Sequence, residues 1–327
     1  MAKRKPRSKQ PLPRASTRIP PTQMLQDLEE VTRLRENQQY QEADMLLNEL
    51  HFRYPNRFEV FAAAAELAQE THNALKLQYA CRRMLELEPK DPESMLGLAH
   101  AYLQQDYRAL AQRTFQEFLR LAPKHPQADI VREILNSIED IARPELENLS
   151  AEDALNLALN HEMVQVLLSE GEYFQAERLC RSMLRQYPDY IPLLNNLSLV
   201  YRMQGKLALA MQTTQRVLEL EPENIHALAN QIQYLCLCGH HEEARTYAEP
   251  LKNSTGPAWK GWLRKAEAAL LLEDYESVLE AYRLYHETKV KEVMLPSAEA
   301  TLAHFAAVAS AHLGDVVEAR LLWQEAL

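Results

Sequence analysis

Four residues around one glycine combine side-chain types that bind soft metal ions. Cys236, Cys238, His240 and His241 fall within six residues of one another, and thiolate sulfur with imidazole nitrogen is a ligand set that suits zinc or copper. The spacing argues against a metal centre, because two residues placed two apart on a helix point to different sides of it. We therefore interpret this cluster as a helix end followed by a turn at Gly239, and we expect no metal site.

The remaining sequence contains no recognisable catalytic motif. It lacks a glycine-rich phosphate loop, a nucleophile elbow and a metalloprotease helix. Adjacent carboxylates, such as Glu29 with Glu30 and Glu242 with Glu243, fall on solvated faces of predicted helices. Acid–base catalysis needs burial that separates two pKa values, and nothing there supplies it. The sequence predicts a protein that is not an enzyme and needs no cofactor.

The helices that carry these residues recur with a period of 34 residues. Prolines, one column of alanines and four of the seven glycines keep this period within two blocks of the chain. The positions are Pro55, Pro89, Pro123, Pro188, Pro222 and, one residue late, Pro257; Ala43, Ala111, Ala176, Ala210, Ala244 and Ala319; and Gly171, Gly205, Gly239 and Gly314. A period of this length with two amphipathic helices per copy predicts tandem helix-turn-helix repeats, each packed only on its neighbours.

Two copies, at 92–125 and from Ile191 onward, resemble the tetratricopeptide repeat. Both follow the family's order of a large residue, a leucine, a small residue and an aromatic residue, then a small residue and a closing proline. The matching residues are Met95, Leu98, Ala99, Tyr102, Ala111, Phe115 and Pro123, and Leu194, Leu197, Ser198, Tyr201, Ala210 and Pro222. The resemblance covers about eight copies over 24–327 and implies an all-α fold, a right-handed α-α superhelix of tandem helix-turn-helix repeats.

The copies predict a division of the chain into four parts. We expect a disordered basic tail at 1–21, a first block of three repeats at 22–125, a linker helix at 126–150 and a second block of about five repeats at 151–327. In the second block the copies at 157–190, 191–224 and 225–258 are in register, the next carries an insertion of about seven residues, and the last is truncated.

The linker is predicted to hold one amphipathic helix at 127–142. Ile130, Ile134, Ile138 and Ile141 form its apolar side, and Pro144 ends it. This helix either closes the groove of the first block or changes the direction of the second block. The other interpretation is that it belongs to a degenerate repeat. A capping box of Ser150 and Asp153 then opens a helix that runs to about Ser169.

The charge of the chain is unevenly distributed. The net charge is −10, yet residues 1–18 contain only basic charges. These are Lys3, Arg4, Lys5, Arg7, Lys9, Arg14 and Arg18. A proline-rich basic tail without an apolar run is expected to be disordered. It is a solvated leader, a weak contact for nucleic acid or another polyanion, or, if the host has a nucleus, a nuclear address at Lys3 to Arg7.

The four cysteines are too few and too scattered for a disulfide framework. Cys81 and Cys180 share the buried column of Phe115, as small hydrophobic residues in a reducing compartment would. Uncharged apolar stretches fall short of the ~20 residues that a membrane-spanning helix needs. We expect a cytoplasmic protein that does not enter membranes.

The resemblance implies a concave groove, lined by the first helix of each copy, that binds a peptide or a partner helix. The implied lining is His161, Gln165, Asn195, Leu199, Arg202, Asn230, Gln233, Arg264 and Glu267. One subgroup of the family clamps the carboxylate of a chaperone's C-terminus with asparagines and lysines. Here Gln165, Leu199 and Gln233 replace that asparagine, and His161 or Ala229 replaces that lysine, which argues against chaperone-tail binding.

Three functions remain open on the sequence. The favoured one is a non-catalytic scaffold that binds other proteins, of unknown identity, through the groove. The others are a nucleic-acid-associated factor that uses the basic tail and the repeat region of a longer enzyme. The last helix ends on Leu321, Leu322, Trp323, Ala326 and Leu327 without a closing helix. Because only part of this apolar set can pack back, we expect the natural chain to continue or this end to dock on another chain.

Overall fold

The computed structural model describes residues 22–138, 149–254, 258–287 and 296–326, and every regular element within them is an α-helix. This confirms the predicted all-α fold of tandem helix-turn-helix repeats. The predicted tail, most of the predicted insertion, Ile141 and Pro144 lie outside the described residues. The chain forms two compact units, Met1–Glu162 and Met163–Leu327, whose boundary falls within α8 (Ala151–Ser169). The block boundaries predicted from the period stay predictions.

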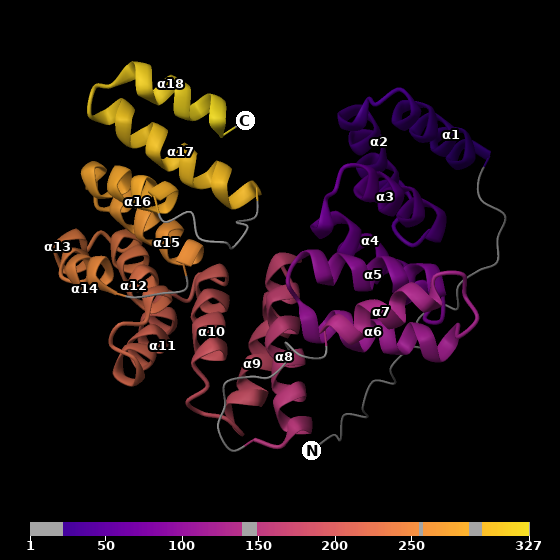
Figure 1. Ribbon diagram of the computed structural model, residues 1–327, viewed down its shortest axis with the longest axis horizontal. Coiled ribbons are helices and arrows are strands. Elements are labelled where there is room, and N and C mark those ends of the chain that lie inside the picture. Colours follow the sequence, from indigo (N-terminus) through magenta and orange to yellow (C-terminus); the bar gives the residue numbers. More distant parts are fainter. Residues whose placement is uncertain (1–21, 139–148, 255–257, 288–295, 327) are drawn as a thin grey trace, which may run out of the picture. The chain divides into compact units, whose positions relative to one another are not determined.

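The first unit stacks three helix pairs and one further helix (Figure 1). Its helices before α8 are α1 (Thr22–Glu36), α2 (Tyr40–Arg53), α3 (Phe58–Glu70), α4 (Ala74–Leu87), α5 (Pro92–Gln104), α6 (Arg108–Leu121) and α7 (Ala128–Ile138). Each pair packs on the next, α2 on α3 and α4 on α5. Within each pair the two helices also pack on each other.

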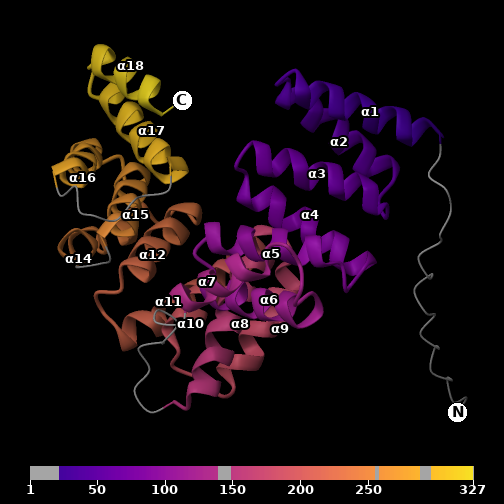
Figure 2. The same ribbon diagram turned by 45° about the vertical axis from the view of Figure 1, so that its right-hand side comes forward.

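The second unit continues the same pattern after α8, as the orange and yellow pairs of Figure 2 show. Its helices are α9 (Tyr173–Leu184), α10 (Ile191–Met203), α11 (Leu207–Leu220), α12 (Ile225–Leu237), α13 (His241–Arg245), α14 (Ala248–Asn253), α15 (Ala258–Leu271), α16 (Tyr275–Glu287), α17 (Pro296–His312) and α18 (Val316–Glu325). The first helices α10, α12, α15 and α17 contact one another in sequence order. They therefore form a continuous row along the unit.

Small residues occupy the closest helix contacts, as the period predicts. Ala99, Ala111, Ser198 and Ala210 are fully buried, because a small side chain lets neighbouring helix axes approach to about 8–10 Å. Cys81 and Cys180 are also buried in the core. The small residues that recur with the period therefore lie at buried positions.

The turn inside each helix pair passes through one residue with a positive φ. These residues are Gln38, His72 and Asp106 in the first unit, and Gly171, Gly205, Gly239, Glu273 and Gly314 in the second, with φ between 52° and 91°. The four predicted glycine turns are confirmed. The other four turns use side chains that the left-handed conformation disfavours, so residue type alone does not reveal them.

The linker helix α7 buries a different stripe from the one predicted. Val131, Leu135 and Ile138 are buried, whereas Ile130 is 55% exposed. Isoleucines repeated every four residues drift around a helix of 3.6 residues per turn, while a spacing of three and four stays on one side. The predicted stripe is therefore right at Ile138, wrong at Ile130 and partly right at the half-buried Ile134, and α7 packs on α6.

The second helix of the copy at 225–258 is broken in two. A single helix was expected, but α13 and α14 are separated at Thr246 and Tyr247. Pro250 explains the break, since its ring clashes with the carbonyl four residues earlier and it has no N–H to donate. Proline is tolerated in the first turn of the new helix α14, where N–H groups have no partner anyway.

The end of the second unit buries part of its apolar set, as predicted. In α18, Ala319 and Leu322 are buried, whereas Leu321 and Trp323 remain exposed. No helix in the described ranges is both long and apolar enough to cross a membrane.

Candidate functional site

Six of the predicted lining residues lie along the row of first helices in the second unit. They are Asn195 and Arg202 on α10, Asn230 and Gln233 on α12, and Arg264 and Glu267 on α15. Equivalent positions of stacked helices face the same way, so the period itself aligns these side chains. We call this set, together with Leu199 between Asn195 and Arg202, the polar face.

A chain of hydrogen bonds links the three helices of the polar face. Asn230 on α12 donates to the Ser198 hydroxyl on α10 at 3.3 Å, and it accepts a hydrogen bond from the Arg264 guanidinium on α15. Arg264 also pairs with Glu267 at 2.5 Å, and Gln233 donates to Glu267 at 3.2 Å. The Asn230–Ser198, Arg264–Asn230 and Gln233–Glu267 bonds each join neighbouring first helices, whereas the Arg264–Glu267 pair lies within α15.

The centre of this network is shielded from water. Asn230 and Ser198 are buried, and the Tyr234 hydroxyl lies 3.3 Å from the Ser198 hydroxyl. Burial raises the pKa of Tyr234 because the ionised form would lose its hydration. Buried polar groups of this kind cost stability unless each is paired, so the network constrains the neighbouring side chains.

Three buried polar atoms of the polar face have no hydrogen-bond partner among the described residues. They are Nε of Arg202, Nε of Arg264 and Oδ1 of Asn195. Buried polar atoms are nearly always paired in folded proteins. These three atoms are therefore unsatisfied inside the face itself.

The two arginines differ in their electrostatic state. The charge of Arg264 is balanced by Glu267 within the same helix. Arg202 has no ion-pair partner in the described part of the chain, although it lies near enough to Tyr234 to lower the pKa of that hydroxyl, against the larger effect of burial. Arg202 is therefore the available positive charge of the polar face.

The other three predicted lining residues are Leu199, His161 and Gln165. Leu199 is half-buried between Asn195 and Arg202 on α10. His161 and Gln165 are half-buried on α8, His161 in the first unit and Gln165 in the second. The role predicted for all nine residues in binding a partner stays a prediction.

Sequence reasoning missed three members of the site. Ser198 was assigned only to the small column, Tyr234 falls one residue before the aromatic column, and Asn224 was not considered. Asn224 accepts from the Asn195 amide at 3.3 Å and also caps α12 through the Ala227 N–H at 3.0 Å. An asparagine directly before a helix is a recognisable cap signal, but its second bond depends on the packing of α10.

The Cys and His residues around Gly239 are spread around the end of α12. Cys236 is half-buried with its sulfur 3.9 Å from the Leu271 carbonyl oxygen, and Cys238 is exposed at the helix end. His240 and His241 are exposed at the start of α13. The described residues contain no group of three or more His, Cys, Asp or Glu side chains placed to hold a metal ion. The basic tail with Lys3, Arg4, Lys5, Arg7 and Lys9 lies outside the described residues.

Comparison with known proteins identifies the repeat. The sequence pattern of the tetratricopeptide repeat matches residues 92–125. The chain is 24% identical over 172 residues to the TPR repeat-containing protein YvcD of Bacillus subtilis (strain 168), which covers 52% of this chain and 35% of that protein. The chain thus spans about a third of the length of this relative.

Two solved structures are similar at low identity. One is the TPR domain of P58(IPK), with 15% identity, a TM-score of 0.35, and 93% of this chain and 92% of that chain covered. The other is a tetratricopeptide repeat protein from Parabacteroides merdae ATCC 43184, with 14% identity, a TM-score of 0.42, and 72% and 91% covered.

Proposed function

We propose that this chain, a tetratricopeptide repeat protein, is a non-catalytic scaffold that holds an extended segment of a partner protein on its polar face. Repeat proteins of this type mediate interactions between proteins. A row of first helices gives a partner segment contacts with several repeats at once. The proposal assigns the binding to α10, α12 and α15 of the second unit.

One observation carries this proposal: a row of polar side chains runs over the consecutive first helices α10, α12 and α15, and the half-buried Arg202 in that row has no ion-pair partner among the described residues. The Arg202 guanidinium can therefore donate hydrogen bonds to oxygen atoms of a partner segment laid along the row. Leu199 adds an apolar contact between the polar ones.

The charge of Arg202 defines the partner more closely. Because Glu267 already balances Arg264, a bound segment should place an acidic side chain opposite Arg202. Guanidinium and carboxylate groups form paired, charge-assisted hydrogen bonds that fix both distance and direction. The preferred segment is therefore extended and carries an aspartate or glutamate near its centre.

Selection from a displayed random-peptide library tests this function. Peptides enriched on the full chain should share an acidic position, and Arg202→Ala should weaken them about 10–100-fold, as loss of a charge-assisted bond implies. Arg178→Ala, which changes an exposed arginine on α9, should leave their affinity unchanged. Peptides without a shared acid, or with equal affinity for both variants, would refute the assignment to the polar face.

A further inference from the structure

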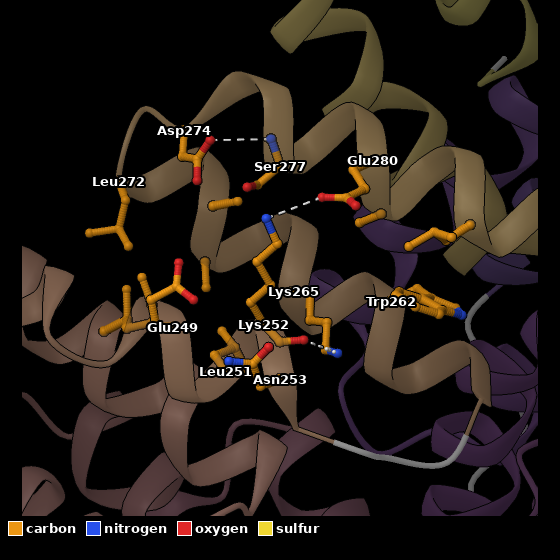
Figure 3. A pocket seen from close by; sticks show the side chains of 16 residues that line it. Glu249, Leu251, Lys252, Asn253, Trp262, Lys265, Leu272, Asp274, Ser277 and Glu280 are labelled. Carbon is orange, nitrogen blue, oxygen red and sulfur yellow. Dashed lines mark hydrogen bonds and ion pairs between the residues drawn. The ribbon is translucent and has the colours of Figure 1, made fainter.

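A second concave feature lies in the second unit, away from the polar face. A pocket of about 260 Å³ opens between α14, α15 and α16. Its apolar lining includes Ile232, Leu251, Trp262, Ala269, Leu272 and Leu284. Figure 3 shows Lys252 of α14 and Lys265 of α15 between Leu251 and Trp262, with Ser277 and Glu280 of α16 above them. The pocket uses a different side of α15 from Arg264 and Glu267.

The broken helix explains why this space exists. Second helices such as α11 have 14 residues, whereas α14 has six. Pro250 causes the break and shortens the helix that would otherwise pack along α15 and α16. The short helix α14 lines one part of the pocket, and side chains of α15 and α16 line the rest together with Ile232, Leu272 and Asp274.

The positive charges at the pocket are already engaged. Lys252 pairs with Glu280 at 3.3 Å, a bond drawn in Figure 3. The Lys265 ammonium donates to the carbonyl oxygens of Lys252 at 2.9 Å and Ser254 at 2.8 Å. It also lies 5.1 Å from the centre of the Trp262 ring, a distance at which a cation is attracted to the ring face.

Two acids at the same pocket have no such partner. Neither Glu249 nor Asp274 forms an ion pair with any described residue, and both are exposed. The Asp274 carboxylate accepts a hydrogen bond from the Ser277 N–H at 3.2 Å, which caps α16. Glu249 and Asp274 therefore give the rim of the pocket an unpaired negative charge, next to its apolar interior.

We propose that this pocket is a second docking site, which takes one bulky apolar side chain of a partner protein that carries a positive charge beside it. The volume lies below the roughly 300–1,000 Å³ of small-molecule sites, and single buried apolar anchors are typical centres of protein interfaces. Glu249 and Asp274 favour a lysine or arginine next to the anchor. This site is independent of the polar face and does not rest on the function proposed for it.

Three dipeptides that differ only in charge test the proposal on the full chain. The probes are the N-acetylated amides of phenylalanyl-lysine, phenylalanyl-glutamine and phenylalanyl-glutamate. Nuclear magnetic resonance follows the indole N–H of Trp262, identified by its loss in Trp262→Phe, with the Trp323 signal on α18 as internal reference. We expect the lysine probe to shift the Trp262 signal at the lowest concentration and the glutamate probe at the highest.

Two kinds of variant separate the roles of shape and charge. Ser277→Leu places a larger side chain in the pocket and should abolish the shift. Glu249→Gln with Asp274→Asn should reduce the preference for the lysine probe about 3–10-fold, and asparagine keeps the cap on the Ser277 N–H. Glu276→Gln, an exposed residue of α16 outside the pocket, is the matched control and should change nothing.

The same data can overturn the proposal. Equal binding of the three probes, no shift of Trp262 with any probe, or an unchanged shift in Ser277→Leu would each contradict it. Thermal unfolding of every variant confirms that a lost shift reflects the pocket and not loss of the fold.

Discussion

A single carboxylate at the end of the first unit does the work of a helix cap. Helix α6 begins after Tyr107, whose side chain makes no capping hydrogen bond. Glu162 accepts instead from the N–H groups of Ala109 at 3.1 Å and Leu110 at 2.8 Å. These first N–H groups of a helix have no partner within the helix itself. A residue more than 50 positions away therefore completes α6.

Removing this remote cap should destabilise the first unit. Glu162→Ala leaves two N–H groups unpaired, so we expect a loss of about 1–3 kcal/mol in the free energy of unfolding. Glu162→Gln keeps one of the two accepting oxygens, so it should lose less than Glu162→Ala. Urea denaturation measures both. Equal losses in the two variants would show that the side-chain oxygen does not cap α6.

The ionisation of Glu162 should make this contribution pH-dependent. Burial raises the pKa of the Glu162 carboxyl, against the lowering effect of its bonds to the Leu110 and Ala109 N–H groups. The folded protein then retains the proton to a higher pH than the unfolded chain does. The stability linked to that proton is full below the ordinary glutamate pKa and is lost as the pH rises through the raised value. Relative to Glu162→Gln, the wild-type protein should therefore gain stability as the pH falls from 7 to 4.5. A difference that stays constant over this range would contradict the raised pKa.

Some residues of the structure's hydrogen-bond networks could be predicted from the sequence, and others could not. Asn230 and Arg264 could be assigned to one face because the period aligns first helices, and the structure joins them by a hydrogen bond. Glu162 and Asn224 could not be found in this way. Their bonds to other helices depend on side-chain reach across a packed contact, which a spacing rule does not contain.

At the level of helix pairs, the turn is the most regular element of the chain. The position with positive φ recurs in both units, yet Gly205 and Glu273 fill it with opposite conformational preferences. A Cβ at Gly205 would meet no atom within 4 Å. Any penalty for a side chain there comes from the backbone alone.

Exchanging residue types at this turn should move stability in opposite directions. Gly205→Ala forces a left-handed alanine and should cost about 1–2 kcal/mol in unfolding free energy. Glu273→Gly relieves the same strain. Because glycine also raises the chain entropy of the unfolded state, the net stabilisation should be no more than about 1 kcal/mol. Denaturant midpoints of the two variants provide the test. A stabilising Gly205→Ala or a destabilising Glu273→Gly would contradict the role of the left-handed turn.

Helix positions followed from sequence better than helix interruptions did. The copies at 58–91 and 92–125 agree with α3 to α6 because the apolar spacing and the closing prolines act locally. The break between α13 and α14 was missed, since Pro250 was not weighed against an otherwise regular period. The stripe of α7 was misassigned because several phases of one helix carry apolar residues, and contact with α6 selects among them.

The molecule as a whole is two stacks of repeats with a candidate binding face on one of them. In a repeat stack each copy contacts its neighbours, so repeated residues produce extended surfaces instead of one enclosed site. The polar face is such a surface, and the pocket beside α14 is a second feature of the same unit. The first arises where the repeat is regular and the second where Pro250 interrupts it. A sequence period therefore predicts the first kind of surface and not the second.

The central claim, binding of a partner protein on the polar face, is tested most directly by comparing the proteins that co-purify with three forms of the full chain. These are the wild type, Leu199→Glu with Arg202→Glu on the polar face, and Arg178→Glu on the exposed side of α9 as the matched control. Each is expressed in the protein's own cells and analysed by quantitative mass spectrometry. We predict a set of proteins enriched with the wild type and with Arg178→Glu, and reduced at least tenfold with the polar-face variant, while the thermal unfolding of all three forms is similar. The same proteins recovered in equal amounts with all three forms would contradict the account.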